Sequence, residues 1–140
     1  MASGLPTILG VNLVTPRGVV AHTDADSVQA PGELGEFELL PGHVPMLTAL
    51  RPGVLTIGTK ARTRYAVSSG YLRVDLSGAV EILVEQALPT IEIDSEIAKK
   101  DLATAEAELA KWGDRPLDGD YVNLQQRAGW ARARLDAIAH

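Results

Sequence analysis

The hydrophobic residues of this chain change their spacing near residue 90. Before that point, apolar side chains alternate with other side chains in short runs, and Gly or Pro separates one run from the next. After it, they recur at intervals of three and four residues. A period of two is typical of strands, and a period of 3.6 is typical of helices. The sequence therefore predicts an α+β protein with a strand domain in residues 1–90 and a helical domain in residues 91–140.

The strand domain contains several runs with the pattern of a half-buried strand. Residues 8–14 alternate between an apolar and a mixed face. Residues 54–57 and 65–67 flank a polar loop, and residues 70–75 and 80–85 flank a second loop, so both pairs are predicted hairpins. Strand-like runs that recur about every ten residues predict an antiparallel sandwich or barrel.

The helical domain contains two amphipathic segments. Asp94 or Ser95 is the predicted N-cap of the first, and Gly113 is its predicted C-cap. The second segment begins near Tyr121. The apolar stripe of the first is Ala98, Leu102, Ala105, Leu109 and Trp112, and that of the second is Leu124, Ala128, Ala131, Leu135 and Ile138. Two such segments with a short loop predict an antiparallel two-helix hairpin.

Small side chains are frequent in both stripes. Alanine permits close approach of two surfaces, but it buries little apolar area. We therefore expect the hairpin to dock weakly and to be movable, with a compact state in which the Ala stripes lie against the strand domain.

Composition and charge exclude several classes of function. The chain has 13 basic and 18 acidic residues, a net charge of −5, which argues against a nucleic-acid binder with a basic face. It has no cysteine, so disulfides and thiol catalysis are impossible. No apolar run approaches the roughly 20 residues that span a bilayer. The start Met1-Ala2-Ser3-Gly4 has neither the features of a secretory signal nor an Arg-rich leader, which favours a bacterial protein.

Catalytic motifs are also missing from the sequence. Ser68-Ser69-Gly70 lacks the pattern of a nucleophile elbow, and three histidines make an ordered triad improbable. Neither Gly-Lys-Ser nor Gly-Lys-Thr, the end of a phosphate-binding loop, occurs in the chain. We therefore predict that the chain is not an enzyme and holds no cofactor.

Residues 35–53 contain the longest ordered motif. An acidic residue and a short apolar run precede Leu40-Pro41-Gly42-His43, and a proline, two apolar residues, a threonine and finally Pro52-Gly53 follow. This pattern resembles the signature of the epsilon subunit of F-type ATP synthases, whose mitochondrial counterpart is called delta. Residues 70–74 resemble a second block of that family, with Ser69 in place of a glycine.

The resemblance implies a fold and a function. The strand domain would be an antiparallel β-sandwich, and the chain would be a non-catalytic central-stalk subunit of a proton-translocating ATP synthase. It would bind the gamma subunit through an apolar face and the membrane rotor ring of c subunits through loops that include residues 31–36, and so couple rotation to ATP synthesis. The implied ring contacts are Glu33, Glu36 and His43. The implied location is the cytoplasmic face of the bacterial plasma (inner) membrane, as a peripheral subunit that forms no homo-oligomer.

The Leu40–His43 segment also has a purely structural interpretation. Pro41 lacks an N–H donor and Gly42 permits a positive φ, so the chain should leave a strand sharply, with His43 bonded to backbone. Glu38 stands where the family that the chain resembles usually has glycine. This difference predicts either an altered local backbone or an added surface charge.

The second helix carries Arg127, Arg132 and Arg134. The resemblance implies that these residues approach the catalytic alpha and beta subunits, at an acidic segment of beta, in an inhibitory state. A solvated helix face is the alternative. Members of that family differ in whether they inhibit ATP hydrolysis, so inhibition stays open for this chain. Trp130 is expected to pack against the strand domain or to bind a partner.

Residues 93–98 resemble the start of the helix that helps bind ATP in several bacterial members of the family. Asp94 and Ala98 match, but Ile97 replaces the arginine that would contact the nucleotide. Capping and packing explain the two matches equally well. Nucleotide binding through Asp94 is therefore expected to be weak or absent.

A second class of function is a free-standing module that senses a nucleotide or a metal. His22, Asp24 and Asp26 occupy alternate positions, so on a strand they would share one face, and such a set could bind a divalent cation. The alternative is a solvated edge strand whose charges deter aggregation. No further ligand stands at a diagnostic spacing, so we predict no metal.

Overall fold

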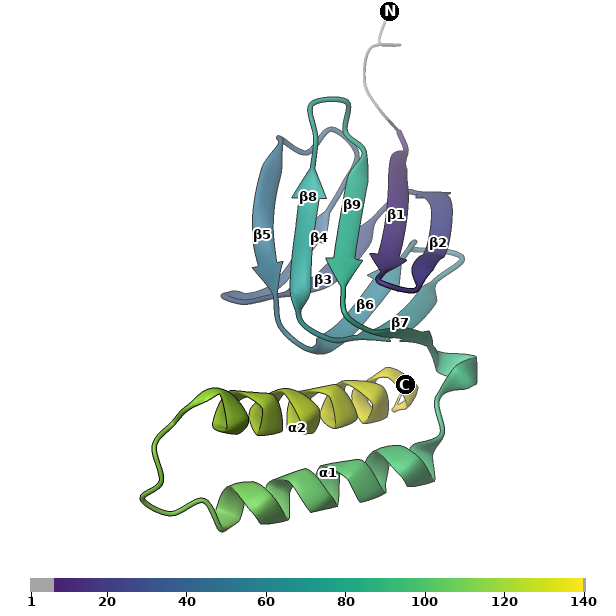
Figure 1. The fold of residues 1–140 in the computed structure, drawn as a ribbon. Helices are drawn as coiled ribbons and strands as arrows, with labels where there is room; N and C mark the ends of the chain where they lie inside the picture. The colour runs from purple at the N-terminus through teal and green to yellow at the C-terminus, as the bar shows by residue number, and fades with distance from the viewer. Residues whose placement is uncertain (1–6, 140) are drawn as a thin grey trace, which may run out of the picture.

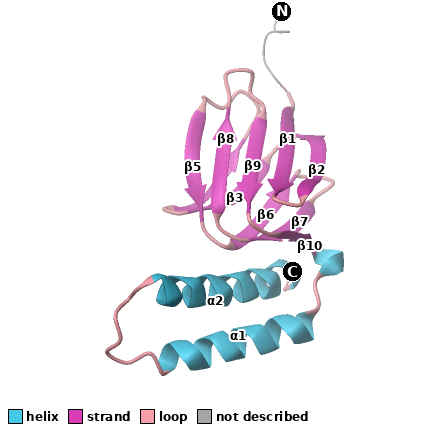
Figure 2. Ribbon diagram, in the orientation of Figure 1, coloured by secondary structure: helices cyan, strands magenta, loops and turns pink. Residues whose placement is uncertain are grey.

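Strands fill the first part of the chain and helices fill the rest, as the change of period predicted (Figure 1; Figure 2). The computed structural model describes residues 7–139, so Met1–Gly4 lie outside the described residues. The strands are β1 (Leu9–Thr15), β2 (Gly18–Ala25), β3 (Val28–Gly32), β4 (Gly35–Leu39), β5 (Met46–Leu50), β6 (Gly53–Ile57), β7 (Thr63–Val67), β8 (Gly70–Val74), β9 (Val80–Val84) and β10 (Ala87–Pro89). A short 3-10 helix, η2 (Thr90–Glu92), leads to α1 (Ser95–Ala110) and α2 (Gly119–Ile138).

The strands form a two-layered β-sandwich. Their hydrogen-bonded order is β10-β7-β6-β3-β5-β8-β9-β1-β2, and β4 pairs with β3. The sheet folds where Gly32 of β3 pairs with Leu50 of β5, which gives a front layer of β5, β8, β9, β1 and β2 and a rear layer around β3, β6 and β7 (Figure 1). The antiparallel sandwich is confirmed, except that β1 and β9 run parallel. No hairpin joins these two strands, so no tight turn forces them to be antiparallel.

Aliphatic side chains on alternate strand positions fill the core between the layers. Leu9, Val11 and Leu13 of β1 are buried, and so are Leu72 of β8 and Ile82 of β9. Each such side chain contributes about 1.5–3 kcal/mol when it leaves water. The core therefore follows directly from the period-two pattern of the sequence.

The two helices lie on one end of the sandwich, with α2 next to the strands and α1 outside α2 (Figure 1). Asp94 is the N-cap of α1, as predicted, and Asp118 caps α2, which begins two residues before Tyr121. α1 ends earlier than predicted, with Lys111 as its C-cap. Gly113 takes a positive φ of 66° in the loop that follows.

The packing of the hairpin corrects the expected compact state. The stripe of α1 packs against α2, where Ala105 meets Ala128. The sandwich is contacted by another face of α2, on which Ala133 and Ala137 pack against Ala66 of β7. Ala133 follows Ala128 by five residues, about 140° around the helix. The expectation that both stripes lie against the strand domain is therefore wrong, because α2 has two buried faces and separates α1 from the sandwich.

Candidate partner-binding surfaces

The outer surface of the front layer carries a continuous row of apolar side chains. Strand register places them opposite one another across the layer, in the order Ala49, Tyr71, Leu83, Val14 and Val19. Side chains that are directly opposite in a sheet point to the same face. Tyr71, Leu83 and Val19 are 57%, 48% and 64% exposed. This set, the apolar row, offers contact area to a partner and not to the protein's own core.

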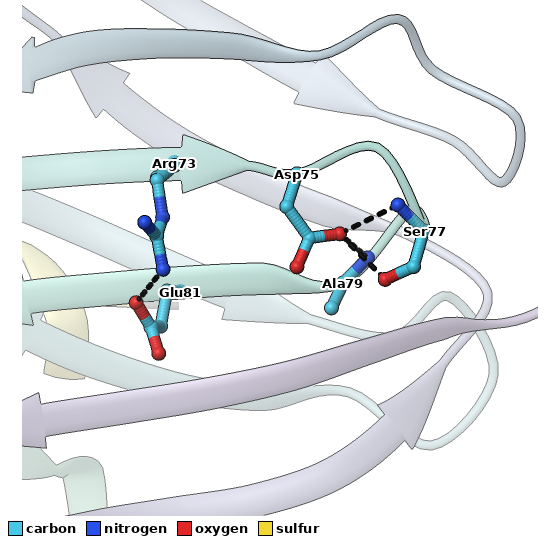
Figure 3. Close-up of polar contacts among 5 residues, drawn as sticks. All are labelled: Arg73, Asp75, Ser77, Ala79 and Glu81. Atoms are coloured by element: carbon cyan, nitrogen blue, oxygen red, sulfur yellow. Dashed lines mark hydrogen bonds and ion pairs between the residues drawn. The ribbon is translucent and has the colours of Figure 1, made fainter.

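A polar row runs beside the apolar row on the same face. Arg73 Nη2 donates to Glu81 Oε1 at 2.6 Å (Figure 3). His22 Nδ1–H donates to Asn12 Oδ1 at 2.7 Å. Register places Glu81 opposite Asn12, so the two pairs are neighbours across β9 and β1. A partner that covers the apolar row would meet these groups at its border, where polar contacts give orientation more than affinity.

Asp75 holds the β8–β9 turn at the end of this face. Its Oδ1 accepts hydrogen bonds from the Ser77 N–H at 2.8 Å, the Ser77 hydroxyl at 2.6 Å and the Ala79 N–H at 3.1 Å (Figure 3). The Ser77 hydroxyl contributes most, and with the backbone N–H groups and Arg73 it lowers the pKa of Asp75 below the ordinary 3.8, although desolvation opposes the shift. The ionised carboxylate is thus part of the turn.

The β3–β4 turn carries two of the three predicted ring contacts. Glu33 and Leu34 form the turn, and the Glu33 N–H donates to the carbonyl oxygen of Ala49 at 3.0 Å. The side chain of Leu34 is fully exposed. Glu36 is exposed on β4 and lines a groove between the rear layer and α2. Because Ala49 begins the apolar row, the turn and the row are adjacent.

The third predicted contact, His43, lies at the other end of β4. The chain turns at Gly42, which has a φ of 87°, and His43 Nδ1–H donates to the carbonyl oxygen of Val44 at 2.8 Å. The predicted turn and backbone bond are therefore confirmed. β4 has five residues, about 15 Å in length, so His43 does not cluster with Glu33.

Glu38 adds a surface charge without altering the backbone. β3 and β4 keep an unbroken register from the Val28–Leu39 pair to the Gly32–Gly35 pair. Gln29 Nε2 donates to Glu38 Oε2 at 3.4 Å across the two strands. Of the two expectations for this position, the altered local backbone is wrong.

The three predicted regulatory arginines have different surroundings. Arg127 is exposed. Arg132 Nη2 pairs with Glu106 of α1 at 3.1 Å, and both side chains are 54% exposed. Arg134 is buried, and its Nη2 pairs with Asp101 of α1 at 3.0 Å. Two of the three arginines are thus engaged inside the hairpin in this conformation.

The face of α2 that meets the sandwich was missed by sequence reasoning. Trp130 packs there with Val54 and with Ala133 and Ala137, so its predicted packing against the strand domain is confirmed. The sequence offered one indication of this face: Ala133 follows Trp130 by three residues, and Ala137 follows Ala133 by four. It was weak because alanine is frequent on every face of this helix.

Asp94 uses its carboxylate within the chain. Its Oδ1 accepts from the N–H groups of Glu96 and Ile97 at 3.0 and 3.1 Å. Glu96 and the neighbouring Glu92 are exposed. Capping therefore accounts for Asp94 without any ligand.

The alternate placement of His22, Asp24 and Asp26 on one strand face is realised only in part. β2 ends at Ala25, and the carboxylate of Asp26 accepts from the N–H and hydroxyl of Thr59 in the β6–β7 loop. These bonds, led by the Thr59 hydroxyl, lower the pKa of Asp26 below the ordinary 3.8 against an opposing desolvation. Within residues 7–139, no three His, Cys, Asp or Glu side chains gather as a metal site would require.

The residues of the apolar row were also not named from the sequence, although an apolar face was expected. Tyr71 and Leu83 occupy outward positions of predicted strands, where the alternation usually places polar residues. These apolar residues at outward positions were the indication of the apolar row that the sequence offered.

Among the helices in the described part of the chain, none is long and apolar enough to cross a bilayer.

Comparison with known proteins agrees with this architecture. A family model described as "ATP synthase, Delta/Epsilon chain, beta-sandwich domain" matches residues 8–90. The ATP synthase epsilon chain of Geobacter sulfurreducens is 43% identical over 128 residues, which cover 91% of each chain. ATP synthase subunit delta', mitochondrial, of Pisum sativum is 39% identical over 103 residues, 71% of this chain and 52% of the pea protein.

A solved structure shows the same fold. A chain in the mitochondrial ATP synthase of Euglena gracilis superimposes with a TM-score of 0.78 at 23% sequence identity. The match covers 97% of this chain and 84% of the Euglena chain. It therefore extends across both the sandwich and the helical hairpin.

Proposed function

Because the chain belongs to the family of ATP synthase delta and epsilon chains, we propose that it is a non-catalytic subunit of the central stalk in a bacterial ATP synthase. It transmits rotation of the membrane rotor ring to the gamma subunit and so couples proton flow to ATP synthesis. It works at the cytoplasmic face of the plasma membrane as a peripheral subunit held by its partners. The observation that carries this proposal is the apolar row on the front layer, adjacent to the β3–β4 turn.

The apolar row suits the gamma subunit. It crosses the front layer without interruption, and its central residues Tyr71 and Leu83 are large and half-exposed. Aromatic residues at the centre of an interface supply much of the binding energy once water is excluded. The Arg73–Glu81 pair lies at its border and would set the orientation of gamma.

The β3–β4 turn suits the rotor ring. Glu33, Leu34 and Glu36 are exposed on one short hairpin, which offers both charge and an apolar tip to the polar loops of c subunits. His43 lies at the far end of β4, so it joins this contact only if the ring also reaches the β4–β5 turn. The ring and gamma would thus bind neighbouring surfaces of one rigid sandwich.

The hairpin is the regulatory part of the proposal. If it inhibits ATP hydrolysis, Arg127, Arg132 and Arg134 meet acidic groups of the alpha and beta subunits. Arg132 and Arg134 already have carboxylate partners on α1, so a partner must replace these contacts before either arginine is released.

Co-purification with gamma tests the proposal. The chain and gamma from the same organism are expressed together, purified through a tag on gamma and separated by size-exclusion chromatography. We expect a stable one-to-one complex. If the chain is folded by circular dichroism when it is purified alone but does not co-purify with gamma, the assignment of the apolar row to gamma is overturned.

A further inference from the structure

The β3–β4 hairpin extends beyond β6, its neighbour in the rear layer (Figure 1). Val28 and Gln29, at the start of β3, pair with β6, and Gly32, at its end, pairs with Leu50 of β5. Within the described residues, β4 pairs with β3 alone. A two-stranded hairpin is only marginally stable by itself. The turn at Glu33 would therefore bend under a sideways force unless other contacts held it in place.

Three hydrogen bonds join this turn to the end of β5. The Glu33 N–H donates to the carbonyl oxygen of Ala49 at 3.0 Å, and the Arg51 N–H donates to that of Pro31 at 3.0 Å. The Arg51 Nε–H donates to the carbonyl oxygen of Gly32 at 3.2 Å, in a contact that is partly buried. Arg51 thus holds two successive carbonyl groups of β3, one through its backbone and one through its side chain.

Close packing supports the same junction. Pro31 is fully buried, and a Cβ added to Gly53 would lie 2.6 Å from Pro31 Cβ. A Cβ added to Gly32 would lie 2.6 Å from the carbonyl oxygen of Gly35 and 2.9 Å from the ring of Phe37. Only glycine fits at these two positions. The hairpin therefore rests directly on the β5–β6 connection.

The Arg51 side chain contacts the turn through a hydrogen bond and not through an ion pair. Among residues 7–139, Arg51 forms no ion pair, although Glu36 lines the same groove. The bond to Gly32 joins positions that are 19 residues apart in the sequence. It therefore fixes the position of the turn relative to β5, which the chain connection between them does not.

The turn and the apolar row meet at this junction. Ala49, which accepts the hydrogen bond from Glu33, begins the apolar row, and Leu50 and Arg51 follow it directly. Leu50 is buried, so the end of β5 is anchored in the core of the sandwich. A force applied at Glu33 thus reaches the row through one hydrogen bond and reaches the end of β5 through the two that Arg51 donates.

We infer that Arg51 is a positioning residue for the proposed ring contact: it holds the β3–β4 turn against the end of β5, so that the turn and the apolar row rotate as one body. This inference rests on the proposed function, in which the turn meets the ring and the row meets gamma. Without the Arg51 side chain, rotation of the ring would bend the hairpin before it moved gamma.

Two substitutions separate the hydrogen bond of Arg51 from its charge. Arg51→Gln keeps an N–H donor in the position of Nε and removes the charge, whereas Arg51→Met places a methyl group there. Amide hydrogen exchange of the free chain is measured by NMR at Glu33. Exchange should be about fivefold faster in Arg51→Met, because one net hydrogen bond changes a local opening equilibrium by about that factor. It should stay close to the original rate in Arg51→Gln. An unchanged rate in Arg51→Met, or an equal rise in both variants, overturns the inference.

Arg62→Met is the matched control. Arg62 Nε–H donates to the carbonyl oxygen of Thr59 at 3.0 Å, so the same donor is removed from the β6–β7 loop instead. Exchange at Glu33 should not change in this variant, and exchange at the buried Leu72 should not change in any of the three. An equal rise at Glu33 in Arg62→Met would mean that the loss of any such bond loosens the sandwich, and Arg51 would then have no role of its own.

Proton pumping in membranes tests the role of Arg51 in coupling. The number of protons pumped per ATP hydrolysed is compared for the original chain, Arg51→Met, Arg51→Gln and Leu34→Asp, which changes the tip of the turn itself. We expect Arg51→Met to lower this ratio at least twofold and Arg51→Gln to retain it, while the affinity for gamma stays the same in both.

The Leu34→Asp variant distinguishes failure of the inference from failure of the proposed function. If Leu34→Asp lowers the pumping ratio and Arg51→Met does not, the turn binds the ring, but Arg51 does not position it. If neither variant lowers the ratio, the ring contact itself is rejected, and the positioning role of Arg51 is rejected with it.

Discussion

At the scale of single residues, acidic side chains decide where several turns and helices of this protein begin. Asp94 and Asp118 cap the two helices, Asp75 holds the β8–β9 turn, and Asp26 fixes the β6–β7 loop through Thr59. Each carboxylate accepts hydrogen bonds from groups that have no other partner in a regular ladder or helix. These contacts make local structure depend on ionised carboxylates.

Asp75→Asn gives the first prediction. The folded chain lowers the pKa of Asp75 below 3.8, so the ionised form stabilises the fold above the pKa of the unfolded chain. The variant should therefore melt at a lower temperature than the original chain near neutral pH. The difference should diminish as pH falls below about 4, since the Asp75 contribution is lost through its folded pKa. Thermal unfolding at several pH values checks this, and a difference that grows toward acid would contradict it.

Asp101→Asn gives the second prediction. Asp101 is half-exposed while Arg134 is nearly buried, so loss of the charge should lower the free energy of unfolding by about 1–2 kcal/mol, less than the ~3–5 kcal/mol of a fully buried pair. Glu106→Gln is the matched control, because the Glu106–Arg132 pair is open to solvent and should change stability by less than about 1 kcal/mol. Urea unfolding measures both. Equal effects would show that burial of Arg134 is not decisive.

At the scale of elements, α2 is the central piece of the helical domain. It contacts β6 and β7 on one face and α1 on another, whereas the contacts of α1 are with α2. Glycine and alanine on the sandwich side let the helix approach the strands closely. An added Cβ at Gly129 would lie 3.1 Å from Pro52 Cγ and 3.2 Å from Pro52 Cβ.

Gly129→Leu gives the third prediction. The larger side chain has no room beside Pro52, so α2 should move away from the rear layer while the sandwich keeps its fold. Methyl NMR shifts of Val54 and Ala66 should change, and those of core residues such as Leu72 should not. Gly119→Leu is the control, since an added Cβ there meets no atom within 4 Å. Unchanged Val54 and Ala66 shifts in Gly129→Leu would mean that the boundary adapts to the added volume.

Much of the element order follows from the sequence because hydrophobic period reports which faces are buried. The hairpins at β6–β7 and β8–β9 and the two helices are confirmed. The parallel pairing of β1 with β9 was not predictable, since it joins segments about 70 residues apart and no local signal specifies it. The second face of α2 was not predicted for another reason. Ala133 and Ala137 are hardly more apolar than the alanines on the other faces of the helix, so only their packing shows that they are buried.

Among the site residues too, those with local effects were predicted from the sequence, and those that depend on tertiary packing were not. The turn at Pro41-Gly42 and the Asp94 cap were predicted, because proline, glycine and aspartate act locally. The apolar row was not, because it exists only through the register of five strands. The family resemblance assigned Arg134 to a partner, whereas in this conformation Arg134 pairs with Asp101.

At the scale of the whole molecule, the apolar row and the proposed regulatory hairpin are separate. The apolar row and the β3–β4 turn belong to the sandwich, while Arg127, Arg132 and Arg134 belong to the hairpin. We expect this division to let the hairpin change position without disturbing the apolar row, whereas Glu36 lines a groove that α2 also borders. Binding of gamma would also stabilise the small aliphatic core by mass action.

Deletion of residues 95–140 gives the fourth prediction. The truncated chain should still assemble with gamma, because the apolar row is intact. If the hairpin inhibits, ATP hydrolysis by the assembled enzyme should rise several-fold. Hydrolysis is measured in membranes that carry the original or the truncated chain at equal subunit content. Unchanged hydrolysis with normal assembly would remove the inhibitory role and leave the stalk role standing.

The most direct test of the central claim is the affinity of the chain for gamma when the apolar row is changed. Leu83→Glu places a charge at the centre of the row, and Val122→Glu places the same charge at an exposed apolar site on α2 as the control. Isothermal titration of gamma should show that Leu83→Glu loses more than about tenfold in affinity, ~1.4 kcal/mol, while Val122→Glu binds as the original chain does. Equal affinity of Leu83→Glu and the original chain would contradict the assignment of this surface to the stalk.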